Sequence, residues 1–126
     1  MFNLSALATA TLIGTVLQVA MVVVGHSIPS VAALFAVGGM GISLLAGALY
    51  VVLARGVGSA PIVGAALAGA LCGLIGIAVS FWLGDVTAML LLAGTASSAV
   101  TGAIGGMIAR MIGLGRAPAP GGAPRG

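Results

Sequence analysis

Very few side chains in this sequence could carry out chemistry. The chain of 126 residues contains one His (His26), one acidic residue (Asp85) and one Cys (Cys72). A nucleophilic triad cannot be distinguished from ordinary packing with so few groups, and a single Cys cannot build a metal site or a disulfide framework. No Lys follows a glycine-rich loop at the spacing of a phosphate-binding motif. We therefore expect no catalytic residue, no metal and no cofactor, and we interpret the protein as non-enzymatic.

The remaining polar side chains suit hydrogen bonding. Gln18 is the strongest polar group within an apolar run, and we expect it to form an interhelical hydrogen bond rather than to bind a solute. Asp85 precedes the last apolar run, where a carboxylate is typical of a helix N-cap. His26 is expected in an interfacial loop; an ion pair with Asp85 that senses external pH is the alternative. Ser97 and Thr101 are further candidates for polar contacts.

Composition assigns these side chains to a membrane protein. Hydrophobic residues make up 61% of the chain and charged residues 4%, whereas roughly a quarter of the residues in soluble proteins are charged. The sequence divides into runs of membrane-spanning length, about 20 residues each. A backbone in lipid must satisfy its own hydrogen bonds, which favours helices. We predict an all-α integral membrane protein with four transmembrane helices, paired by short connections into two antiparallel hairpins.

The expected domain organisation is simple. A four-helix transmembrane domain covers residues 1–112, with spans at about 3–24, 31–54, 62–83 and 87–110. The first run has no Arg or Lys before it, so we interpret it as a retained helix rather than a cleaved signal peptide. Residues 113–126 are rich in Pro, Gly and Ala and are expected to form a flexible cytoplasmic tail.

The arginines predict the orientation of the chain. In a four-span arrangement all of them fall on the side that also holds the N-terminus; they are Arg55, Arg110, Arg116 and Arg125. Cytoplasmic loops are enriched in Arg and Lys, so both termini are expected in the cytoplasm, most simply with the chain in a bacterial inner membrane. Tyr50 and Trp82 are expected at the two membrane interfaces, where aromatic rings are common.

Small residues recur at helical spacing and predict close helix packing. Because lipid tails are as apolar as Leu, membrane helices associate where Gly, Ala and Ser let their backbones approach. The fourth run contains the most regular series, and similar series occur in the second and third runs. The expected packing seam consists of Gly94, Ser98, Gly102 and Gly106, with Gly39, Ser43 and Gly47, and with Gly69 and Gly73.

One segment resembles a known family. The stretch GHSIPSVAALFAVGGMG (residues 25–41) resembles the second-helix entry of small four-span proteins of the fatty-acid-export type, in which a Gly, Ser, Pro, Ser turn opens a Gly-rich span. Small multidrug-resistance exporters carry a carboxylate in their first helix, where this chain has Gln18. Dual-topology fluoride channels carry an early Arg and an Asn in the second helix, which this chain lacks.

Two kinds of function fit these observations. The first is a small structural or accessory subunit, whose partners are the lipid bilayer and either copies of itself or other membrane subunits, with no role for nucleic acid. The alternative is a pore or a carrier of a small solute or lipid, holin-like or transporter-like. In the alternative, Ser97, Ser98 and Thr101 would line a weakly polar path where two fourth helices meet.

Overall fold

The computed structural model describes residues 3–55 and 60–114. Over these residues the regular elements are all helices, namely α1 (Leu4–Ser27), α2 (Pro29–Ala32), α3 (Phe35–Ala54), α4 (Ala60–Trp82) and α5 (Ala88–Met111). Four of them, α1, α3, α4 and α5, are long and apolar enough to cross a membrane. The all-α class and the four candidate spans are therefore confirmed. Arg116, Arg125 and the expected tail from residue 115 onward lie outside the described residues.

The connection after α1 differs from the expected one. Ile28 is extended (φ −123°, ψ 102°), as is usual for a residue that precedes proline, and Pro29 starts the short helix α2. A turn at Ala33 and Leu34 follows, so that α3 begins at Phe35. The second long helix therefore starts four residues later than the expected position 31, because the proline turn and α2 occupy the intervening residues.

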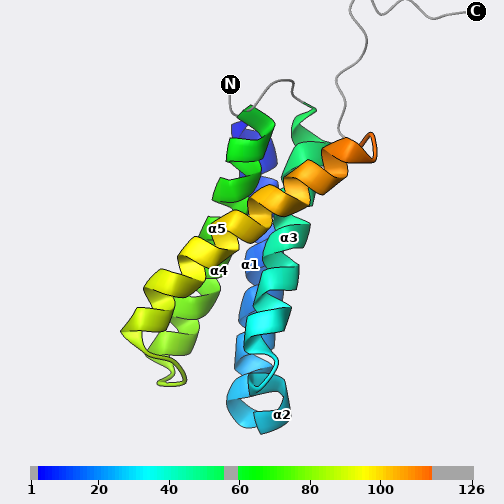
Figure 1. The fold of residues 1–126 in the computed structure, drawn as a ribbon. Coiled ribbons are helices and arrows are strands. Elements are labelled where there is room, and N and C mark those ends of the chain that lie inside the picture. The colour runs from blue at the N-terminus through cyan, green and yellow to red at the C-terminus, as the bar shows by residue number, and fades with distance from the viewer. Residues whose placement is uncertain (1–2, 56–59, 115–126) are drawn as a thin grey trace, which may run out of the picture.

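The long helices are arranged in two groups that diverge from a common crossing (Figure 1). Helices α1 and α3 run alongside each other, and α4 packs most extensively against α5. Helix α5 crosses α3 obliquely and contacts it. The end of the molecule that holds the start of α1 and the end of α5 is called the crossing end below. The end that holds α2 and the turn between α4 and α5 is called the open end.

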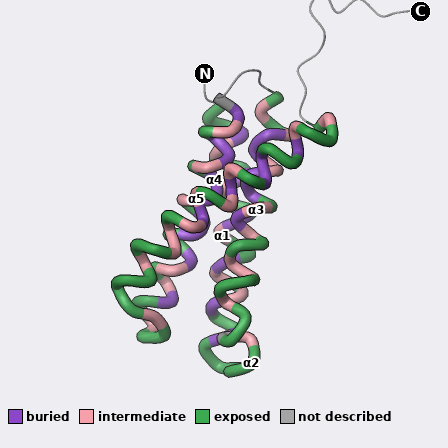
Figure 2. The backbone as a smooth tube through the Cα atoms, viewed as in Figure 1, coloured by how far each residue is buried: buried purple, intermediate pink, exposed green. Residues whose placement is uncertain are grey.

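The buried core lies at the crossing end. Its members come from the first turns of α1, the second half of α3, the first half of α4 and the end of α5; they are Ala6, Ala10, Ala46, Tyr50, Val51, Ala65, Ala68, Cys72 and Ala109. Figure 2 shows buried residues concentrated at this crossing and exposed residues around α2. Most of these side chains are small, so the helix backbones lie close together there.

Tyr50 is the large exception in this core. Its side chain is 1% exposed, and its hydroxyl accepts a hydrogen bond of 3.2 Å from the backbone N–H of Asn3. The ring lies directly against Gly64, where a Cβ atom would collide with it. Tyr50 is therefore buried inside the bundle, where the glycine on α4 leaves room for its ring, and its expected depth at the membrane interface stays a prediction. Trp82, at the end of α4, is 84% exposed.

Candidate functional site

The predicted seam residues lie at helix contacts inside the chain. A Cβ atom at Gly102 would lie 2.5 Å from the carbonyl oxygen of Ala65 and 2.9 Å from the Cα atom of Gly69. A Cβ atom at Gly47 would collide with the carbonyl of Gly102. The other members make similar contacts: Gly94 faces Ile77, Ser98 lies against Gly69 and Gly73, Gly106 faces Ala65 and Val51, and Gly39 and Ser43 lie beside Gln18. These contacts are intramolecular, and association with a second copy stays a prediction.

A small polar cluster connects three helices next to this seam. The side-chain amide of Gln18 on α1 donates to the carbonyl of Gly39 (3.1 Å) and to Ser43 Oγ (3.3 Å), both on α3. Ser43 Oγ donates to the carbonyl of Gly69 on α4 (3.5 Å), and Cys72 Sγ donates to the same carbonyl (3.4 Å). A carbonyl oxygen can only accept a hydrogen bond, so the end of the Gln18 amide group that faces Gly39 must be the nitrogen, Nε2. The amide oxygen Oε1 lies between α3 and α4, 3.5 Å from where a Cβ atom of Gly39 would be and 3.3 Å from where one of Gly76 would be.

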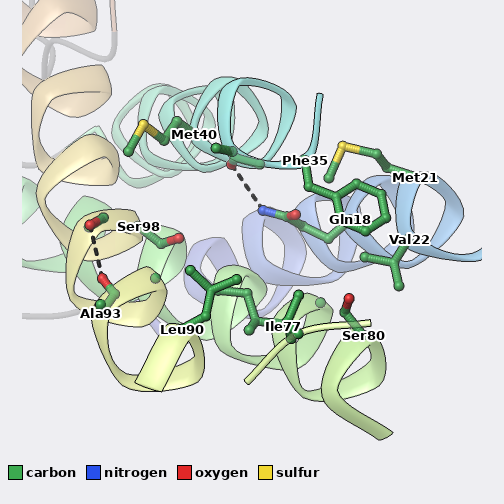
Figure 3. A pocket seen from close by; sticks show the side chains of 16 residues that line it. Gln18, Met21, Val22, Phe35, Met40, Ile77, Ser80, Leu90, Ala93 and Ser98 are labelled. Atoms are coloured by element: carbon green, nitrogen blue, oxygen red, sulfur yellow. Dashed lines mark hydrogen bonds between the residues drawn. The ribbon is translucent and has the colours of Figure 1, made fainter. Parts of the chain in front are cut away.

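A cavity of about 190 Å³ extends from this cluster toward the open end (Figure 3). All four long helices contribute to its wall, together with Val86 from the turn between α4 and α5. The lining residues are Gln18, Met21 and Val22 of α1; Phe35, Ala36, Gly39 and Met40 of α3; Gly76, Ile77 and Ser80 of α4; Val86; and Leu90, Ala93, Gly94, Ser97 and Ser98 of α5.

The cavity opens sideways, between α3 and α5. Its lining residues on these two helices include Met40 and Leu90, which are 45% and 46% exposed, and the exposed Ala36 and Ala93. By contrast, the lining residues on α1 and α4 include Gln18 and Ser80, which are 3% and 2% exposed. Helices α1 and α4 therefore form the floor, and the mouth faces outward from the helix bundle, where lipid surrounds a membrane-embedded chain.

The hydroxyl groups around the cavity fall into two classes. Ser97 Oγ donates to the carbonyl of Ala93 (2.9 Å) and Thr101 Oγ1 to that of Ser97 (2.7 Å), so both protons are used within α5. Ser80 is 2% exposed, and within the described part of the chain its hydroxyl oxygen has no hydrogen-bond partner. The Ser98 side chain is 5% exposed and points toward the α4 backbone at Gly73. Thr101 does not line the cavity.

His26 and Asp85 meet at the open end, beyond the residues that line the cavity. His26 Nδ1 lies 2.9 Å from Asp85 Oδ2 and 3.1 Å from Oδ1, and the two side chains are 46% and 25% exposed. This contact joins the end of α1 to the turn between α4 and α5. Val22 and Val86, which line the cavity, lie on the same two segments. The pair therefore connects the two helix groups at the open end.

Asp85 is not the N-cap of α5, contrary to expectation. Gly84 has φ +85°, and its N–H bonds to the carbonyl of Phe81 (3.0 Å) while the N–H of Asp85 bonds to that of Ser80 (3.0 Å). This double closure is a Schellman motif, which ends α4 and uses Gly84 and Asp85 as its last residues. Thr87 then caps α5, accepting from the N–H of Leu90 (3.3 Å).

Sequence reasoning missed the cavity and most of the residues that line it. Ser80 stands in a run with Gly73 and Gly76 at helical spacing, which predicts packing equally well. Phe35 and Met40 are ordinary apolar residues of a membrane span. A signal for the cavity would have required knowing which helix faces which, and the small-residue pattern alone does not contain that information.

No known protein family, curated protein or solved structure matches this chain. Its function is therefore argued from the site, since a fold alone does not define one. In residues 3–55 and 60–114, no group of three or more His, Cys, Asp or Glu side chains could hold a metal ion. The cavity offers apolar walls with a few uncharged hydrogen-bonding groups, which is typical of sites for small molecules.

Proposed function

We propose that this protein is a non-enzymatic integral membrane protein that binds a small lipophilic molecule taken up from the bilayer, and so acts as a carrier. The observation that supports this most directly is the cavity between α3 and α5, whose mouth is formed by exposed residues of both helices. An engineered cavity of about 150 Å³ binds benzene, so about 190 Å³ is enough for roughly seven or eight non-hydrogen atoms.

The proposed membrane arrangement has two antiparallel hairpins with both termini in the cytoplasm of a bacterium. Arg55 and Arg110 lie at the ends of α3 and α5, at the crossing end, whereas His26 and Asp85 lie at the open end. The excess of Arg on cytoplasmic sides supports this orientation in the inner membrane. Gln18 is about 14 Å along the helix axis from Ser27, roughly half of a 30 Å hydrocarbon core. The cavity would then lie in the outer leaflet.

The test uses the full chain in lipid nanodiscs that contain a trace of a lipid with a diazirine on its acyl chain. After irradiation, labelled peptides are mapped by mass spectrometry. We expect labelling to concentrate at the mouth, around Met40 and Leu90, and to fall several-fold in Ala93→Trp, in which a bulky ring fills the opening. Ala96→Trp is the matched control, because Ala96 is also exposed on α5 but does not line the cavity.

A uniform distribution of label would contradict the proposal. Val100 and Ile104 are 60% and 41% exposed on α5 away from the cavity, and they report simple contact with lipid. If these positions were labelled as strongly as the mouth, and if Ala93→Trp had no more effect than Ala96→Trp, the cavity would not be a binding site.

A structural or accessory role in a homo-oligomer or a larger membrane complex is the second candidate. The observation that favours it is Gly41, an exposed glycine on α3 with no atom within 4 Å of its Cβ position. Small residues on an outward helix face allow another membrane helix to approach closely. Gly41→Leu would then reduce the size of the assembly in mild detergent, whereas Val37→Leu, a change at a neighbouring exposed position, would not. Equal sizes for wild type and Gly41→Leu would remove this support.

A further inference from the structure

The described lining of the cavity carries no charged side chain. His26 and Asp85 lie beyond its end and are paired with each other. Arg55 and Arg110 lie at the crossing end of the molecule. Burying an unpaired carboxylate or ammonium group costs many times more than burying a neutral polar group. A ligand that fills this cavity is therefore neutral over the part that enters it.

The cavity floor nevertheless has unused hydrogen-bonding capacity. Ser80, almost fully buried, has a hydroxyl with no partner among the described residues. Gln18 uses its amide N–H groups on α3, so its oxygen Oε1 remains available as an acceptor. A buried polar group without a partner is destabilising, and a ligand that supplies the partner recovers that free energy.

These two groups lie along one strip of the floor. Gln18 Oε1 is 3.3 Å from the Cβ position of Gly76, and Ser80 is one helical turn further along α4 on the same face. In Figure 3 the Ser80 hydroxyl points away from α4 toward the side of α1 that carries Gln18 and Val22. Helix α4 therefore offers the hydroxyl of Ser80, which can donate a hydrogen bond, and α1 offers the amide oxygen of Gln18, which can only accept one.

We infer that the cavity selects an uncharged amphiphile with a hydroxyl group, which accepts a hydrogen bond from Ser80 and donates one to Gln18 Oε1. A hydroxyl both donates and accepts, so it matches this pair, whereas an ether or ester oxygen can only accept. The remaining lining, including Phe35, Ile77 and Leu90, contacts the alkyl part. This inference rests on the proposed binding function of the cavity and adds the chemical class of the ligand.

The experiment uses a seven-carbon alcohol bearing a diazirine as the probe, with the full chain in nanodiscs. Four unlabelled competitors of similar length are compared: 1-heptanol, heptyl methyl ether, heptanoate and heptane. We expect 1-heptanol to compete best, heptyl methyl ether and heptane about threefold to tenfold less well, and heptanoate at pH 8 least of all. This series needs no substitution, so it remains decisive even if a variant fails to fold.

A variant series tests the residues themselves. Ser80→Ala is expected to weaken competition by 1-heptanol about threefold to tenfold and to leave competition by heptane unchanged. Thr95→Ala is the matched control, because the Thr95 hydroxyl bonds to the carbonyl of Leu91 (2.7 Å) within α5 and does not line the cavity. An equal loss for 1-heptanol and heptane in Ser80→Ala would mean that the cavity had changed shape, and would overturn the assigned role of Ser80.

The outcomes separate this inference from the proposed function. All competitors could displace the probe equally while Ala93→Trp still abolished labelling. The cavity would then bind lipophilic molecules without selecting those with a hydroxyl group, and only the present inference would fail. If neither Ala93→Trp nor any competitor reduced labelling, the binding function would fail as well. Preferential competition by heptanoate would overturn the requirement for a neutral ligand.

Discussion

Glycines at the two ends of the molecule look alike in the sequence and do different things in the structure. At the crossing end, Cβ atoms at Gly47 and Gly105 would collide with backbone carbonyls of Gly102 and Leu44. At the open end, a Cβ at Gly38 would lie 2.6 Å from Met21 Sδ, and one at Gly94 would lie 2.5 Å from Ile77 Cδ1. The first kind of glycine brings two backbones together, whereas the second leaves space for the end of a flexible side chain. Close contact between backbones and contact between a backbone and a flexible side chain therefore arise from the same residue type.

The largest effect is expected from a methyl group at the crossing. Gly47→Ala would push α3 away from the carbonyl of Gly102, and a backbone cannot move aside cheaply, so we expect destabilisation of about 3 kcal/mol. Gly41→Ala is the control on the same helix, because open space surrounds that position. Unfolding in a mixed-micelle titration with sodium dodecyl sulfate measures both. Equal stabilities for the two variants would contradict the role assigned to the crossing.

A smaller loss is expected where Tyr50 joins α3 to the start of α1. Tyr50→Phe removes the acceptor of the Asn3 N–H bond and keeps the ring on Gly64, so destabilisation of about 0.5–1.5 kcal/mol is expected. The same titration measures it, and amide hydrogen exchange at the first turn of α1 should increase. No change in stability or exchange would mean that this bond does not hold the start of α1.

Glycines at the open end should tolerate a methyl group better. In Gly38→Ala and Gly94→Ala the contacting atoms are the ends of Met21 and Ile77, which can change rotamer, so a change of less than about 1 kcal/mol is expected. The measurement is the same titration, alongside Gly47→Ala. Losses as large as that of Gly47→Ala would show that the open end is packed as rigidly as the crossing, and the comparison would break down.

The smallest effect is expected from the pair that joins the two groups at the open end. A double-mutant cycle with His26→Ala and Asp85→Ala should give a coupling energy of about 0.2–1 kcal/mol, because both side chains are partly exposed and solvent screens them. The coupling should decrease in high salt. A distance measurement by paired spin labels on α2 and on the turn between α4 and α5 should broaden in either single variant. An unchanged distribution would mean that packing alone sets the separation of the groups.

Composition and run length were sufficient to predict the four candidate spans, since both depend only on local sequence. The contact between His26 and Asp85 was only the alternative interpretation, which placing both connections on one side of the membrane allows but does not require. The sequence did not predict the features that depend on tertiary contacts or on the geometry of turns. Asp85 is a plausible N-cap until Gly84 adopts positive φ and draws it into the end of α4. The burial of Tyr50 could not be predicted from its own segment, because the space for its ring is provided by Gly64 on another helix.

Trp82 gives this molecule a natural optical reporter. It is the only tryptophan in the chain, it is 84% exposed, and it sits at the end of α4 beside the turn that carries Asp85. All indole fluorescence therefore originates from one known site. Quenching by bromine atoms placed at successive depths along lipid acyl chains would measure how far the open end of the protein sits below the membrane surface, without any added label.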